Sequence, residues 1–163
     1  MKPDVKNLVS NFSETAQRVK DRLKQSGFVL PVSHQGGIKF KHIWIARNKD
    51  SNTWSVRNLH NSNKIYHEHI CSIKIAVAIA IYEGLGVKYN ADALLKQDHQ
   101  YSHYYNEVVI FKNSIKNAIK LGDEFKQIVA ETRLDVVQVG LDSEIIQVNS
   151  ILKQAENLLF KNK

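Results

Sequence analysis

Two histidines and a glutamate recur at helical spacing in the second half of the sequence. His99, His103 and Glu107 stand at positions i, i+4 and i+8, which would place all three on one face of a helix. Histidine pairs at this spacing bind divalent metals. However, Gln100 occupies the place where zinc proteases carry glutamate, and no Glu-x-x-His pair of the di-iron type occurs. The segment is therefore a candidate metal site or a solvated helix face.

A second group of histidines lies in the first half of the chain. His67 and His69 flank Glu68, so a strand would present both imidazoles on one face. His42 and His60 fall in the same predicted sheet region. This group is a candidate for metal binding or acid–base chemistry, although no nucleophile or orienting carboxylate can be assigned beside it. The alternative is a half-exposed strand face.

No other motif indicates catalysis. Cys71 opens an apolar segment, where a cysteine usually behaves as a small hydrophobic residue. Gly84-Leu85-Gly86 follows a predicted helix rather than a strand, so it lacks the context of a dinucleotide-binding loop. A single cysteine also excludes a disulfide framework within the chain. We therefore predict no cofactor and no enzymatic activity.

Charge is unevenly distributed along the 163 residues, whose formal net charge is +7. Residues 1–89 carry a balance of +8, and residues 90–163 carry −1. A basic surface attracts polyanions such as nucleic acid or an acidic protein partner, although it also favours solubility alone. The candidate nucleic-acid residues are Lys39, Lys41, Arg47 and Arg57, with Trp44 and Trp54 among them.

The N-terminal half is expected to hold one helix and a small sheet. Apolar residues at steps of three and four predict a helix over 5–25. Residues 28–32 predict an edge strand that contains a proline, and 38–47, 53–59 and 64–70 predict further strands of an antiparallel meander. In the strand over 38–47, Trp44 shares a face with Ile38 and Phe40 and is expected to point to the core, while Lys39 and Lys41 are expected to face water.

Residues 71–83 are almost uniformly apolar and predict a buried helix that packs on the sheet. Ser72 is a candidate N-cap, and Gly84 is expected to end the helix. A membrane span needs about 20 apolar residues, and this segment is shorter and contains Lys74. We therefore expect no membrane partner.

The C-terminal half predicts a helical hairpin. Asn90 caps a helix that runs to Leu121, Gly122 ends it, and Asp123 caps the next. The last segment is either one long kinked helix or two helices, because Gly140 interrupts its pattern. A heptad seam of apolar residues predicts self-association. Its members are Leu141, Ile145, Val148, Leu152, Ala155 and Leu159.

Further apolar residues lie off this seam. They are Ile110, Val136, Val139, Ile146, Ile151, Leu158 and Phe160. More than one apolar stripe on a helix implies a second packing partner. We expect a second copy of the chain to supply part of it, which predicts a homo-oligomer.

Together these features predict a single α+β domain over 1–163. It comprises an N-terminal helix, a small antiparallel meander packed on a buried helix, and a long C-terminal antiparallel helical hairpin (residues 90–163). The first twenty residues lack the apolar core of a signal peptide, so a cytoplasmic protein is expected.

The order of these parts resembles that of a group of uncharacterised small proteins of marine tailed bacteriophages. The likeness rests on residues 28–32, on the strand around His42-Ile43-Trp44-Ile45, on the alanine-rich 76–80 and on the helix start from Asp98 to Tyr101. The resemblance implies no catalytic residue. It implies an accessory or virion-associated protein, located in the bacterial host cytoplasm or in the virion.

Overall fold

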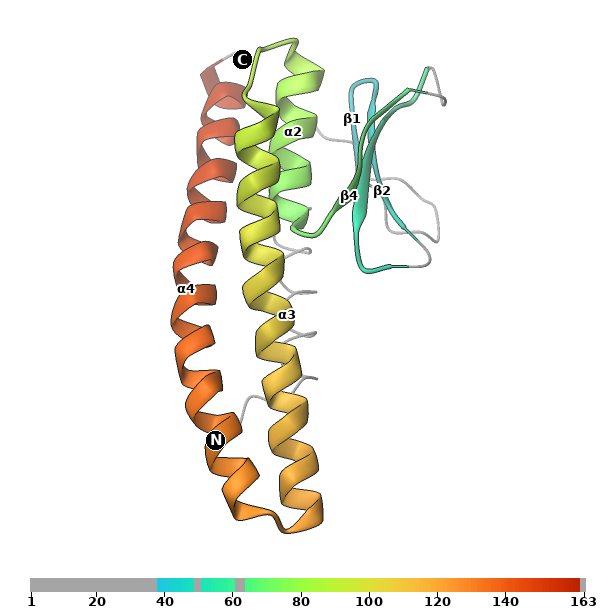
Figure 1. Ribbon diagram of the computed structural model, residues 1–163. Helices are drawn as coiled ribbons and strands as arrows, with labels where there is room; N and C mark the ends of the chain where they lie inside the picture. Colours follow the sequence, from blue (N-terminus) through green and yellow to red (C-terminus); the bar gives the residue numbers. More distant parts are fainter. Residues whose placement is uncertain (1–37, 49–50, 61–63, 162–163) are drawn as a thin grey trace.

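The computed structural model of the protein describes residues 38–48, 51–60 and 64–161 (Figure 1). The predicted helix over 5–25 and the predicted strand over 28–32 lie outside these residues. The described part is of the α+β class, as predicted, with four strands followed by three helices. The elements are β1 (Ile38–Phe40), β2 (Ile43–Arg47), β3 (Trp54–Asn58), β4 (Ile65–Ile70), α2 (Ile73–Leu85), α3 (Ala91–Leu121) and α4 (Glu124–Lys161).

The sheet is an antiparallel meander in the order β1-β2-β3-β4, as predicted. One strand prediction is wrong, because 38–47 is a hairpin of β1 and β2 rather than a single strand. Lys41 adopts a left-handed backbone conformation in the turn, with φ of 52°, and Phe40 pairs with Ile43. The two turn residues shift the alternation, so Ile43 and Ile45 join Ile38 and Phe40 in the core.

The same shift corrects the expected position of Trp44. Paired residues of neighbouring strands lie on the same face of a sheet, and Trp44 pairs with Lys39 on one side and Arg57 on the other. Its neighbours Ile43 and Ile45 are almost wholly buried, whereas Trp44 is half-buried. Trp44 therefore lies on the face opposite to the core. Trp54 and Val56, in contrast, are buried in the core.

Helix α2 forms the middle layer of the molecule. It contacts the strands on one side and α4 on another, and eight of its thirteen residues are buried. A helix that is apolar on all sides can be stable only in such an enclosed place. Ser72 is the N-cap residue by position, but its side chain makes no capping hydrogen bond. The helix ends at Leu85 rather than before Gly84, and the C-cap residue Gly86 takes the left-handed conformation that such a cap requires.

Helices α3 and α4 form the predicted hairpin. The Asn90 side chain accepts a hydrogen bond from the Ala93 N–H, and Asp123 accepts one from the Lys126 N–H. Gly122 closes α3 in the left-handed conformation. The hairpin is longer than α2, so in the described part of the chain the first half of α4 packs on α3 alone (Figure 1).

Helix α4 runs through Gly140 as one continuous helix. This settles the alternative left open by the sequence. Gly140 lies against the ring of Tyr104, with no room for a side chain between them. The glycine is therefore a close-contact position between α3 and α4 rather than a break.

Candidate functional site

The first histidine group does not form a metal site in the described part of the chain. His99 and His103 are exposed on α3, and Glu107 is half-buried one turn further along. A shallow depression between α3 and α4 contains both histidines and Glu144, but not Glu107. Across residues 38–48, 51–60 and 64–161, no three His, Cys, Asp or Glu side chains are grouped closely enough to hold a metal ion.

The second histidine group is only partly brought together, since the rings of His42 and His60 stack with their centroids 6.5 Å apart. His67 lies within 3.3 Å of the Tyr89 hydroxyl through Nε2, and that hydroxyl donates a hydrogen bond of 2.7 Å to Glu83. Burial lowers the pKa of His67, although the nearby Glu83 carboxylate opposes the shift. His69 is exposed. The pairing of β3 with β4 is irregular around His67, which removes the simple alternation from which one shared face was predicted.

Asp98 has a role that sequence reasoning missed. It is almost fully buried, and its carboxylate accepts hydrogen bonds from the backbone N–H groups of Cys71 (2.9 Å) and Ser72 (2.8 Å). These groups directly precede α2, so Asp98 caps the N–H groups just ahead of the helix. They are not the N–H groups that a Ser72 side-chain cap would bind, which lie in the first turn. Burial raises the pKa of Asp98, and the two hydrogen bonds oppose the rise. Spacing along the chain carries no sign of a cap 26 residues away.

Cys71 is half-buried beside this cap, and burial raises the pKa of its thiol. A reactive cysteine needs a lowered pKa, because the thiolate is the nucleophile. The environment of Cys71 therefore favours the inert, packing role.

The predicted self-association seam belongs to the core of this same chain. Leu141, Val148, Leu152, Ala155 and Leu159 are buried, and the last four join α2 and the sheet in one core cluster. Only Ile145 of the six is exposed. The seam is thus used within the molecule, and the expectation that it forms the surface between copies is corrected.

The opposite face of α4 carries a second apolar row, which we call the outer stripe. Its five large apolar side chains are 62 to 76% exposed. The stripe consists of Phe125, Ile128, Thr132, Val136, Val139, Ser143 and Ile146. These positions keep to the 3.6-residue period and lie about half a turn from the buried seam.

The outer stripe includes members of the off-seam group that predicted a second packing partner. Val136, Val139 and Ile146 are exposed on α4, and Ile110 is exposed on α3. Ile151 and Leu158 are half-buried instead, and the side chain of Phe160 lies outside the described part. Phe125 and Ile128 extend the exposed row to the hairpin tip.

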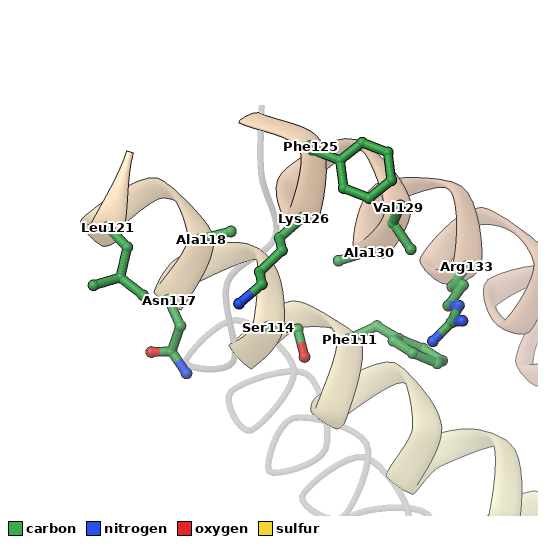
Figure 2. Close-up of a pocket in the computed structure, with 10 residues that line it drawn as sticks. All are labelled: Phe111, Ser114, Asn117, Ala118, Leu121, Phe125, Lys126, Val129, Ala130 and Arg133. Atoms are coloured by element: carbon green, nitrogen blue, oxygen red, sulfur yellow. The ribbon is translucent and has the colours of Figure 1, made fainter. Parts of the chain in front are cut away.

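A groove of about 370 Å³ adjoins the start of the outer stripe, between α3 and α4 (Figure 2). Phe125, Val129 and Phe111 form its apolar wall. Lys126 and Arg133 reach over it from α4 (Figure 2). The apolar surface at the tip is therefore bordered by two cations on the side that faces α3.

Charges are sorted along the two flanks of the outer stripe. The segment of α4 between residues 124 and 142 contains two cations, Lys126 and Arg133. Both lie on the flank next to α3. The acidic residues of the same segment all lie on the other flank. They are Glu124, Glu131, Asp135 and Asp142.

The predicted nucleic-acid residues are only partly brought together. Lys39 and Arg57 flank Trp44 in direct register on one face of the sheet. Lys41 lies in the β1–β2 turn. Arg47 pairs with the buried Trp54, so it lies on the other face of the sheet, and it donates a hydrogen bond to Asn52.

No family model, curated protein or solved structure matches this chain. None of the helices in the described ranges is both long and apolar enough to cross a membrane.

Proposed function

We propose that this chain is a non-enzymatic interaction protein that assembles with a second copy of itself through its C-terminal hairpin. The observation that carries the proposal is the outer stripe, which is apolar, periodic and exposed on a well-formed helix. Burying one such side chain fully contributes about 1.5 to 3 kcal/mol. Five of them in each copy can outweigh the loss of freedom on association.

The flanking charges favour a second copy as the partner. When two α4 helices pack side by side in the same direction, the acidic flank of one faces the basic flank of the other. In the opposite direction, like flanks meet, and Asp135 approaches its own counterpart. The surface is thus self-complementary in the parallel arrangement, which supports a two-fold dimer with its axis along the hairpin.

The double variant Val136→Glu/Val139→Glu tests the surface by placing two carboxylates in the middle of the outer stripe. We expect wild-type protein to have the mass of a dimer in light scattering and the variant to have the mass of a monomer. Ile110→Glu is the control, because Ile110 is also apolar and exposed but lies on α3. A dimer that persists in the double variant contradicts the proposal.

Cysteine crosslinking tests the parallel arrangement separately. In a Cys71→Ser background, Phe125→Cys alone should form a disulfide between copies on mild oxidation. A protein with Phe125→Cys in one copy and Ile146→Cys in the other should form no mixed disulfide. A disulfide between Phe125→Cys and Ile146→Cys, with none between two copies of Phe125→Cys, would show an antiparallel dimer. That result would contradict the parallel orientation but not the dimer itself.

The biological setting of the assembly follows from the resemblance to tailed-phage proteins. It supports an accessory or virion-associated role, in the host cytoplasm or in the virion. Detection of the protein in purified particles, or its restriction to infected cells, would separate these two locations.

A further inference from the structure

A row of three side chains crosses the sheet on the face away from α2. Lys39 of β1 pairs with Trp44 of β2, which pairs with Arg57 of β3. Neighbouring strands lie about 4.8 Å apart, so an indole ring stands between two cations. We call this set the Trp44 row.

The core does not account for the position of Trp44. The β1–β2 turn directs Ile43 and Ile45 inward, and the core cluster of the described residues includes Trp54 but not Trp44. Trp44 is half-buried rather than enclosed. A large aromatic side chain on an outer sheet face is a common feature of surfaces on which bases stack.

A hydrogen bond orients one cation of the Trp44 row, Arg57. The Nε of Arg57 donates a hydrogen bond of 3.0 Å to the Ser55 hydroxyl, which fixes the root of the guanidinium over β3. Ser55 Oγ in turn contacts the Ala46 carbonyl oxygen at 3.4 Å. The two terminal guanidinium nitrogens, Nη1 and Nη2, are well suited to donate hydrogen bonds to a phosphate.

The surrounding charge has the sign that a polyanion requires. Residues 38–70 contain six lysines and arginines against two acidic residues. Lys41 adds positive charge at the β1–β2 turn, 5.7 Å from the ring centroid of the core-facing Phe40. Lys64 extends it at the start of β4, 5.2 Å from the Tyr66 ring centroid.

We infer that the Trp44 row binds single-stranded nucleic acid, with a base stacked on Trp44 and adjacent phosphates held by Lys39 and Arg57. A single strand fits this surface, because its bases can unstack from one another and stack on the Trp44 ring. A duplex keeps its bases paired and offers the row only phosphates. Stacking on one ring reads no base edge, so little sequence preference is expected.

Fluorescence anisotropy with a labelled oligothymidine tests the site, with the intact protein at low salt. Trp44→Ala should weaken binding by about 5- to 150-fold. A plot of the logarithm of the binding constant against the logarithm of the salt concentration has a negative slope. Lys39→Gln and Arg57→Gln should each reduce the magnitude of this slope by about 0.7. Lys120→Gln is the control, since Lys120 is exposed at the far end of α3 and should bind as wild type does.

Two further measurements keep the inference open to refutation. Trp44→Phe retains an aromatic ring and should bind between wild type and Trp44→Ala, provided that all variants unfold at the same temperature. Equal binding of a matched duplex, or equal competition by polyglutamate, would show simple charge attraction and overturn the inference. So would an absence of oligothymidine binding, or an unchanged affinity of Trp44→Ala.

Discussion

At the scale of single residues, Gly140 allows α3 and α4 to approach each other closely. In a free helix, Gly→Ala stabilises by about 1 kcal/mol, because alanine loses less backbone entropy. Here a β-carbon would meet the ring of Tyr104. We therefore expect Gly140→Ala to lower the free energy of unfolding by about 1 to 3 kcal/mol in urea titrations. An increase in stability would show that α3 and α4 do not approach closely at this point.

Asp98 makes a residue-scale prediction about pH. Burial raises its pKa above the ordinary value of 3.8, so the folded state holds this proton more tightly than the unfolded state does. This contribution to stability is therefore present below pH 3.8 and is lost as the pH rises through the raised pKa.

Asp98→Asn removes this titration while keeping an oxygen that can accept one of the two N–H groups. The unfolding free energy of wild type minus that of Asp98→Asn should decrease as the pH rises from 3.8 through the raised pKa of Asp98. It should then stay constant at higher pH. A difference that moves in favour of wild type would mean that the two hydrogen bonds, and not burial, dominate the pKa.

At the scale of elements, the β1–β2 hairpin is a sharp test of the fold. Lys41 holds a φ of 52°, a conformation that costs a side-chain-bearing residue about 1 to 2 kcal/mol. Lys41→Gly should therefore stabilise the protein, or at worst leave it unchanged, in thermal unfolding. Lys39→Gly, in the middle of β1, should destabilise it by about 0.5 to 1 kcal/mol. Equal losses in the two variants would favour a continuous strand.

The elements themselves were largely predictable from periodicity, but two consequences of the fold were not. Helices α3 and α4 follow from apolar spacing and from the capping residues Asn90, Gly122 and Asp123. The β1–β2 turn was missed because Lys41-His42 lacks glycine and asparagine, the usual markers of such turns. That omission also reversed the predicted face of Trp44.

At the scale of the whole molecule, α4 presents two apolar faces, one of which is buried while the other is exposed. Sequence periodicity alone shows both faces but cannot assign them, because either could pack on α2. The fold resolves this by burying Val148, Leu152 and Ala155 and leaving Val136 and Val139 exposed. The arrangement of the histidine groups likewise depends on tertiary placement, which local spacing does not report.

The most direct test of assembly through the outer stripe is the mass of the wild-type protein by light scattering coupled to size exclusion. It would be measured along a dilution series at low and high salt. We expect a dimer at both salt concentrations, since apolar burial on the outer stripe is not screened by salt. Dissociation should occur only on dilution. A strict monomer at every concentration, in both buffers, would contradict assembly through the outer stripe.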